Sequence, residues 1–359
     1  MQVKDYIRRD LRGWQNYQVQ PVSGRKMDAN ESPFPLPDAV KRELSRWLLE
    51  EENFRLYPET DNTELRETIA AGCGIRPDQI TCTVGSDQMI DYLTKVFLEP
   101  GESILVPEPT FSMYETAAVI NHGRAFSFPL DEAHDYRYDA EVLLESVRKV
   151  EPKLLFLCTP NNPTGAAMPL SSLQEIAEQT TCLIVLDEAY GEFSDVDTLP
   201  LILEYPRIIS LRTFSKAYGL AGLRVGYAIA DPDLIRAIDL VRAPYNLNTF
   251  SQKAAALVFG RAEYREHVGW IRAERDRMYQ ALKEMEGVRG FHCYPSDANY
   301  LFMKSDVKNP GAYMLRQGLL PRSYGESMAG CLRVTVSDRD SNDLFLAQMR
   351  RMLLVEENE

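Results

Sequence analysis

Between residues 80 and 230 the hydrophobic positions fall in short continuous runs separated by polar, helix-spaced stretches. Runs of about four to eight apolar residues are typical of strands that are buried on both faces of a parallel sheet. Strands that alternate with helices predict an α/β domain with a mostly parallel, covered sheet. The expected strands are 80–84, 103–106, 154–158, 183–186, 208–211 and 225–229.

Beyond residue 245 the pattern changes to long, charged helical stretches with a few strand-like runs between them. This mixture predicts a smaller α+β domain over residues 246–359, beside a large domain over residues 38–245. Residues 1–37 are irregular and proline-bearing, so we expect an arm there rather than a domain. The expected elements of the small domain are 254–259, 263–285, 300–303, 332–336 and 340–353.

The composition narrows the class of protein. A chain of 359 residues with 45% hydrophobic residues fits one large catalytic unit, and a net charge of −13 without a basic run argues against nucleic-acid binding. Six cysteines without a C-x-x-C pair and four scattered histidines predict reduced thiols and no metal site. The start lacks a signal peptide and no apolar stretch is long enough for a membrane span. We therefore expect a cytoplasmic protein.

Lys216 lies in the segment TFSKAYGLAG, between two of the expected core strands. A lysine at the end of a buried strand can lose its charge and become nucleophilic, which suits Schiff-base chemistry. Thr213, Ser215 and Arg224 supply donors of the kind that hold a phosphate. One amine for an aldehyde and three donors for a phosphate together indicate pyridoxal phosphate. A strand-end lysine beside an ordinary loop is the other interpretation, and only context elsewhere in the chain separates them.

Two other strand ends carry polar residues that fit the same cofactor. Asn162, in the segment CTPNNPTG, follows one apolar run, and open α/β sheets bind ligands at the carboxyl ends of their strands. We expect Asn162 to donate a hydrogen bond to a cofactor oxygen, although a structural Asx turn explains it as well. Asp187 ends another run, and a buried carboxylate needs a partner such as a protonated pyridine nitrogen. Tyr190, three residues later, is placed to reach the ring's phenolic oxygen.

Two more stretches suggest anion binding. Gly85, Ser86 and Asp87 stand where a strand turns into a helix, and the free N–H groups there can bind a phosphate. A plain N-cap role for Ser86 or Asp87 is equally consistent with the spacing. Arg333 lies in the apolar run CLRVT, and an arginine that faces inward from a strand needs an anionic partner.

The segments NPTG, DEAY and TFSKAYGLAGLR resemble those of the fold-type I pyridoxal-phosphate aminotransferases, and within these the histidinol-phosphate aminotransferase family. The resemblance extends over almost the whole chain. It implies a pyridoxal-phosphate-binding large domain, a smaller α+β C-terminal domain, and an N-terminal arm that packs with the small domain. It also includes the segments 27–34, 55–59, 84–88, 109–114, 242–246 and 330–335.

The resemblance implies roles for the cofactor-binding residues. Lys216, Asp187 and Tyr190 match the family's catalytic positions. Residues 85–87 match its cofactor-phosphate site, and Phe111 matches an aromatic residue that stacks on the pyridine ring.

Other matches concern the neighbouring subunit and the substrate. Tyr57 resembles a tyrosine that crosses to the neighbouring subunit and touches its cofactor phosphate, which implies a homodimer with shared active sites. The resemblance assigns the substrate carboxylate to Arg333 and the phosphate of histidinol phosphate to Arg322. Looser matches place Tyr17 over the substrate and Asn30 at the entrance.

The expected reaction is transamination between histidinol phosphate and 2-oxoglutarate, in histidine biosynthesis. An aromatic amino-acid aminotransferase would use the same site with another pocket, and a threonine-phosphate decarboxylase resembles the family in fold. A transcription regulator that senses pyridoxal phosphate would need a DNA-binding module, for which residues 1–37 leave no room.

Overall fold

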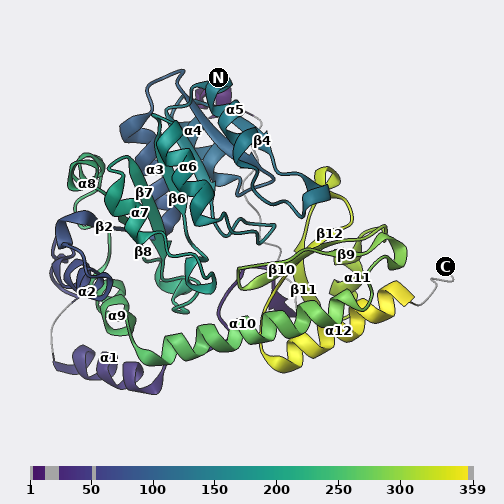
Figure 1. Cartoon of the computed structure of the whole chain (residues 1–359). Helices are drawn as coiled ribbons and strands as arrows, with labels where there is room; N and C mark the ends of the chain where they lie inside the picture. The colour runs from purple at the N-terminus through teal and green to yellow at the C-terminus, as the bar shows by residue number, and fades with distance from the viewer. Residues whose placement is uncertain (1–2, 13–23, 51–53, 355–359) are drawn as a thin grey trace.

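The described chain forms two β-sheets, each with helices packed on it. Figure 1 shows the long helix α10 (Ala262–Lys283) running from the side of the larger sheet to that of the smaller one, where it lies beside α12 (Arg339–Leu354). The computed structural model describes residues 3–12, 24–50 and 54–354.

The larger sheet has seven strands and confirms the expected α/β fold. Its inner pairs β3–β5, β5–β6 and β6–β7 are parallel, as is β3–β4, whereas β8 runs antiparallel to both β7 and β2. In spatial order the strands are β2 (Ile80–Thr83), β8 (Gly226–Ile229), β7 (Ile208–Thr213), β6 (Leu183–Asp187), β5 (Leu154–Cys158), β3 (Ser103–Glu108) and β4 (Arg124–Pro129).

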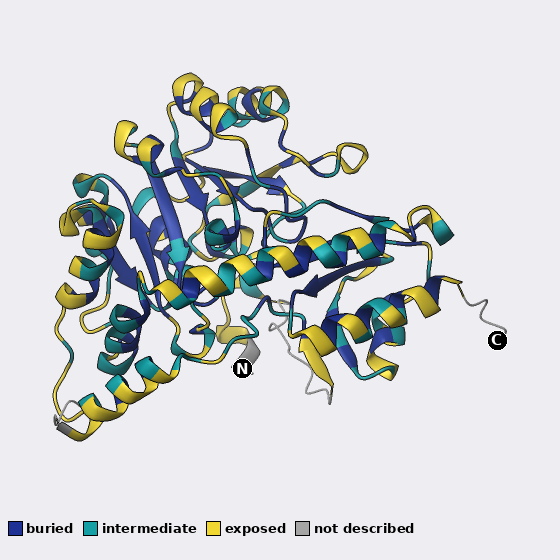
Figure 2. Ribbon diagram, turned by 60° about the horizontal axis from the view of Figure 1, so that its bottom comes forward, coloured by how far each residue is buried: buried dark blue, intermediate teal, exposed yellow. Residues whose placement is uncertain are grey.

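The inner strands are buried on both faces, which explains their continuous hydrophobic runs. In β5, Leu154 and Phe156 pack under α3, α4 and α8, whereas Leu155 and Leu157 pack under the helices of the opposite face. Figure 2 shows these strands buried at the centre of the larger part. The helices are α1 (Asp38–Glu50), α2 (Thr63–Cys73), α3 (Gly85–Phe97), α4 (Met113–Ile120), α5 (Ala140–Val150), α6 (Leu170–Gln179), α7 (Leu199–Glu204), α8 (Pro232–Asp239) and α9 (Thr249–Val258).

The sequence pattern did not predict β4. Most of its residues are exposed or half-buried, and only Phe128 is buried, so the strand has no continuous hydrophobic run. It lies at the edge of the sheet, where one side of the strand faces solvent and polar residues are tolerated.

The smaller sheet has five strands and packs against α10, α12 and α11 (Pro310–Arg316). Residues 25–27, expected to be irregular, form an edge strand that pairs in parallel with β11. Three residues are too few to carry a periodic signal. The spatial order is β1 (Arg25–Met27), β11 (Leu319–Ser323), β12 (Cys331–Thr335), β10 (Tyr300–Lys304) and β9 (His292–Cys293).

Two segments that were expected outside the large domain pack with the larger sheet: helix α9, and the part of the N-terminal arm that contains Arg8. Helix α9 buries Ala254, Ala255 and Val258 in the core beneath that sheet, against α2 and α1. Near the start of the chain, the Arg8 guanidinium donates to the carbonyl of Ile120, at the end of α4, at 2.9 Å. Among the described residues, no helix is both long and apolar enough to cross a membrane.

Candidate active site

Three neighbouring strand ends meet at one edge of the larger sheet. Cys158 of β5 pairs with Asp187 of β6, which pairs with Leu211 of β7. Because all three strands are parallel, the segments that follow them emerge at the same edge. These segments carry Asn162, Tyr190 and Lys216, so the sheet brings together residues that the sequence separates widely.

Asp187 is a buried carboxylate with two hydrogen-bond donors. Only 3% of the residue is exposed; its Oδ2 accepts from the Tyr114 hydroxyl at 2.6 Å and its Oδ1 from the Ala189 N–H at 3.1 Å. Burial raises the pKa of Asp187 to about 6, against the lowering effect of the two donors. Among the described residues it has no ion pair, so a cationic partner would complete it.

Lys216 extends from the loop after β7 toward the smaller sheet. Its amine donates to the carbonyl of Ala29 at 2.8 Å and lies 5.7 Å from the ring centre of Tyr190. Burial, together with the positive charge of Arg333, lowers the pKa of Lys216 to about 8. About a tenth of the amine is then neutral at pH 7, far more than for an ordinary lysine, so it is suited to act as a nucleophile and as a proton acceptor.

Ser86 and Asp87 open helix α3 close to Arg224. The guanidinium of Arg224 bonds the Asp87 carboxylate at 3.1 Å and donates to the Ser215 hydroxyl at 3.3 Å. The Thr213 hydroxyl in turn donates to the Ser215 hydroxyl at 3.0 Å. Hydroxyls, a guanidinium and the N-terminus of a 13-residue helix make a site suited to a phosphate.

Gly85, the first residue of α3, is favoured by its backbone conformation and lies close to Arg224. Its φ of +73° lies in the left-handed region, and an added Cβ would meet Arg224 Nη2 at 2.5 Å. A side chain at this position would therefore displace the guanidinium from the helix N-terminus.

Asn30 joins the N-terminal segment to the ring of Tyr190. Its side-chain amide donates to the Tyr190 hydroxyl at 2.8 Å, and its main-chain N–H donates to the Thr335 hydroxyl at 2.9 Å. Asn30 is 1% exposed. It was expected at the entrance of the site, whereas the structure buries it between Tyr190 and β12, where it can fix the phenol's position.

Arg333 reaches from β12 of the smaller sheet into the same region. Its guanidinium donates to the Asn162 side-chain oxygen and to the carbonyl of Asp28. Its centre lies 5.2 Å from the ring of Tyr300. Nε is buried and has no hydrogen-bond partner in the described part of the chain. Arg322 is the cross-strand partner of Arg333, so the two side chains share one face of the sheet.

The remaining predicted residues differ in where they lie. Phe111 is half-buried at the start of α4, edge-on to the Tyr114 ring with centres 5.7 Å apart. Tyr57 is 80% exposed and stacks on Tyr245 at 4.5 Å, a position open to a second subunit rather than inside this site. Tyr17 lies outside the described residues.

Sequence reasoning missed Tyr114 and the main-chain oxygens of Asp28 and Ala29. Tyr114 had one signal: it stands only three residues after Phe111, in the segment that follows the end of a core strand. The contacts of the Asp28 and Ala29 carbonyls had no sequence signal, because every residue has a carbonyl oxygen. Only the folded course of the backbone brings these two oxygens to Arg333 and Lys216.

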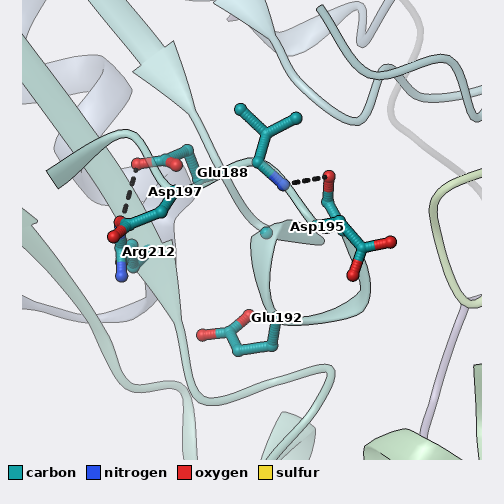
Figure 3. A pocket seen from close by; sticks show the side chains of 8 residues that line it. Glu188, Glu192, Asp195, Asp197 and Arg212 are labelled. Atoms are coloured by element: carbon teal, nitrogen blue, oxygen red, sulfur yellow. Dashed lines mark hydrogen bonds and ion pairs between the residues drawn. The ribbon is translucent and has the colours of Figure 1, made fainter. Parts of the chain in front are cut away.

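An acidic cavity of about 190 Å³ lies on the other side of β6. Glu188 follows Asp187, so it points to the opposite face, where Arg212 lies 3.3 Å from its carboxylate (Figure 3). Burial raises the pKa of nearby Glu192 to about 7. None of the predicted site residues lines this cavity, so we separate it from the site. The lining residues are Glu188, Gly191, Glu192, Ser194, Asp195, Val196, Asp197 and Arg212.

The arrangement fits pyridoxal phosphate on this structure's own geometry. Asp187 offers a buried negative charge for a ring nitrogen, and Tyr190 with Asn162 offers donors near a ring oxygen. Arg224 and the N-terminus of α3 suit the phosphate, and the amine of Lys216 suits the aldehyde. This fold and this residue set define the fold-type I, pyridoxal-phosphate-dependent aminotransferases.

Comparison with known proteins gives the same class as the fold and the site residues. The chain belongs to the class I and II aminotransferases, whose family model matches residues 24–347. It is 36% identical over 353 residues to a histidinol-phosphate aminotransferase from Ruminiclostridium cellulolyticum, a match that covers 97% of this chain and 98% of that protein.

Solved structures show the same fold. The histidinol-phosphate aminotransferase of Sinorhizobium meliloti, solved in complex with pyridoxal-5'-phosphate, has a TM-score of 0.82 and 24% identity, covering 92% of this chain and 91% of that one. The L-threonine-O-3-phosphate decarboxylase of Porphyromonas gingivalis has a TM-score of 0.76 and 21% identity, covering 91% and 99%. Fold alone therefore does not separate transamination from decarboxylation.

Proposed function

We propose that this enzyme transfers an amino group between histidinol phosphate and 2-oxoglutarate, forming imidazole acetol phosphate and glutamate in histidine biosynthesis. The relative that is 36% identical to this chain is named a histidinol-phosphate aminotransferase, which supports this substrate pair. The supporting observation in this chain is the pair of arginines on adjacent strands of the smaller sheet, Arg333 and Arg322, which are cross-strand partners.

Two arginines suit two different anions. Arg333 is 7% exposed, and its guanidinium has one buried nitrogen without a partner among the described residues, so an anion can add to its contacts. We assign the carboxylate of glutamate and 2-oxoglutarate to Arg333, and the phosphate of histidinol phosphate to Arg322 with help from Arg333. Tyr17, outside the described residues, is proposed to close over the substrate.

Each residue near the cofactor has one proposed task. When bound, pyridoxal phosphate supplies an electron sink for the electron pair left when the substrate's C–H bond breaks. The neutral amine of Lys216 would hold the cofactor at its aldehyde carbon, and it would act as the base for the proton on the substrate carbon. Asp187 would keep the ring nitrogen protonated, Tyr190 and Asn162 would donate to the ring oxygen, and Phe111 would pack on the ring.

The phosphate is proposed to lie at the other end of the site. Gly85, Ser86 and Asp87 would offer the helix N-terminus, and Ser215 with Arg224 would complete the set. Thr213, which bonds the Ser215 hydroxyl, would orient it. These contacts carry no part of the proton transfer and serve to hold the cofactor.

We further propose a cytoplasmic homodimer in which Tyr57 reaches the partner's cofactor phosphate. The exposed aromatic pair of Tyr57 and Tyr245 supports this, together with the exposed side chains of Phe54 and Leu56 beside it. We keep the division into an arm over residues 1–37, a large domain over 38–245 and a small domain over 246–359 as part of the proposal. Sedimentation of the purified protein with and without Tyr57→Asp tests the dimer.

The substrate proposal is tested by single turnovers of the purified holoenzyme. Histidinol phosphate, glutamate, phenylalanine and threonine phosphate are each mixed with enzyme, and the spectral change of the cofactor and the release of CO2 are recorded. Rapid amino transfer from histidinol phosphate and glutamate without CO2 is the expected result. Transfer from phenylalanine but not from histidinol phosphate would instead identify an aromatic aminotransferase, and CO2 from threonine phosphate a decarboxylase.

A further inference from the structure

Tyr114 touches the buried carboxylate of Asp187 but has no role in the scheme above. It is fully buried, and its hydroxyl donates to Asp187 Oδ2 at 2.6 Å. Its ring stacks on Phe156 of β5, with centres 4.8 Å apart and planes 22° apart. The ring of Phe111 also packs on it, edge-on, with centres 5.7 Å apart. The phenol is therefore held in place by contacts with the sheet and with the proposed stacking residue.

The two donors bond different oxygens of the Asp187 carboxylate. Tyr114 donates to Oδ2 and the Ala189 N–H donates to Oδ1, so each oxygen keeps a lone pair for a further donor. A phenol that donates to a carboxylate stabilises the charged form and opposes the effect of burial. Without this hydroxyl, the carboxylate would be held at one oxygen only and would bind a proton more readily.

We propose that Tyr114 is a positioning residue that keeps Asp187 ionised and correctly oriented toward the cofactor's ring nitrogen. This inference rests on the proposed function, because it needs Asp187 to be the partner of that nitrogen. Through its edge contact with Phe111, the same side chain also fixes the residue proposed to stack on the ring. Tyr114 itself acts through these two side chains and does not need to touch the cofactor.

The chain contains a matched control. Tyr138 is also buried, and its hydroxyl donates to a carbonyl, that of Cys158, at the same distance of 2.6 Å. Cys158 is the cross-strand neighbour of Asp187, so Tyr138 lies close to the site without touching a carboxylate. Tyr138→Phe therefore removes a similar buried hydrogen bond and reports the general cost of losing one.

The experiment uses holoenzyme loaded with pyridoxal phosphate labelled with ¹⁵N in the ring. The ¹⁵N chemical shift reports whether the ring nitrogen is protonated, and equilibrium dialysis gives the cofactor's dissociation constant. Tyr114→Phe is expected to move the shift toward the unprotonated value and to weaken cofactor binding about tenfold, the typical effect of one hydrogen bond to a charged group. Tyr138→Phe is expected to leave the shift at the wild-type value.

A double-mutant cycle tests whether Tyr114 acts through Asp187. Once Asp187→Asn has removed the charge, adding Tyr114→Phe is expected to change the shift and the affinity little further. If the shift and the affinity of Tyr114→Phe match those of Tyr138→Phe, Tyr114 is a packing residue and the inference is overturned. Full additivity in the cycle would overturn it as well.

The same data separate this inference from the proposed function. An Asp187→Asn protein with an unchanged ¹⁵N shift would show that Asp187 is not the ring nitrogen's partner, which removes the site assignment itself. Should Tyr114→Phe fail to fold, 3-fluorotyrosine at position 114 keeps the shape and donates more strongly. It should move the ¹⁵N shift toward greater protonation, and an unchanged shift would contradict the inference.

Discussion

The two ends of the cofactor site are built in opposite ways. At the ring end, Asp187 is 3% exposed and has neutral donors, Tyr114 and the Ala189 N–H. At the phosphate end, Arg224 and Asp87 form an ion pair at 3.1 Å, with side chains that are 44% and 47% exposed. A buried charge is costly unless it is paired, whereas an exposed pair is screened by water and salt.

This difference assigns different tasks to the two ends. Protonation at the ring end is controlled by burial, so small changes there alter the chemistry. The phosphate end can lose one contact and keep the rest, because several donors share the anion. Substitutions at the ring end should therefore change both the rate and the cofactor affinity, whereas those at the phosphate end should change the affinity and leave the rate at saturation almost unaltered.

Lys216, between the two ends, should show the largest effect. Lys216→Ala removes both the covalent attachment and the proton carrier, and the rate should fall more than about a thousandfold. Borohydride reduction of the wild-type holoenzyme, followed by peptide mass spectrometry, should place the cofactor on Lys216. Label on another lysine would contradict the assignment. Lys153 serves as the control substitution, because it is exposed and directly precedes β5, at the opposite end of the strand from the site.

Asp187→Asn, at the ring end, should have the second-largest effect on the rate. Without this carboxylate the ring nitrogen would lose its proton and the cofactor would become a weaker electron sink, so the rate should fall by about a hundredfold or more. Asp87→Asn, at the open end, is the matched control and should reduce the rate far less. Single-turnover rates of both variants, with thermal melting to check folding, test the comparison. Equal losses would show that burial does not distinguish the two ends.

The cofactor-free protein should show the burial of Asp187 as a pH dependence of its stability. The pKa of about 6 in the folded state exceeds the ordinary value of 3.8, so the folded protein binds more protons between these values. Stability from this group is therefore highest below pH 4 and falls as the pH rises to about 6, by about 3 kcal/mol. Urea unfolding of wild type and Asp187→Asn at several pH values gives the difference in the free energy of unfolding. A difference that does not change between pH 4 and pH 6 would contradict the burial of this charge.

Arg333→Ala should slow the half-reactions of the two substrates by different factors. Losing hydrogen bonds from a charged group costs about 1.5–3 kcal/mol, or about ten- to a hundredfold. The glutamate half-reaction should suffer most, because histidinol phosphate has no carboxylate and provides an internal control. An unaffected glutamate half-reaction would remove Arg333 from the site. Equal damage to both half-reactions would favour one anion site shared with Arg322.

Arg224→Gln should have the smallest effect. A half-exposed ion pair is worth about 1 kcal/mol or less, so cofactor binding should weaken about fivefold with little change in the rate at saturation. In wild type, added salt should weaken binding by screening the same contact, and the variant should respond less. A large loss of rate at saturating cofactor would show that the phosphate end contributes to the chemistry.

The sequence by itself determined the strands that build the site. Lys216, Asp187 and Asn162 each follow a continuous hydrophobic run, and a buried parallel strand needs such a run on both faces. Since parallel strands end at one edge, these residues could be expected together without coordinates. Lys216 also stood out by chemistry, because a lysine between core strands is rarely a solvated one.

Only the tertiary structure decided which side chains complete the site. Tyr114 meets Asp187 across 73 positions of the chain, Arg333 meets Asn162 across 171, and Asn30 meets Tyr190 across 160. Hydrophobic periodicity reports which face of an element is buried, but not which remote side chain it meets there. These contacts depend on how helix α4 packs on the larger sheet and on how the smaller sheet packs beside the larger one. For that reason the sequence indicated a buried carboxylate at Asp187, and the fold supplied the phenol that holds it.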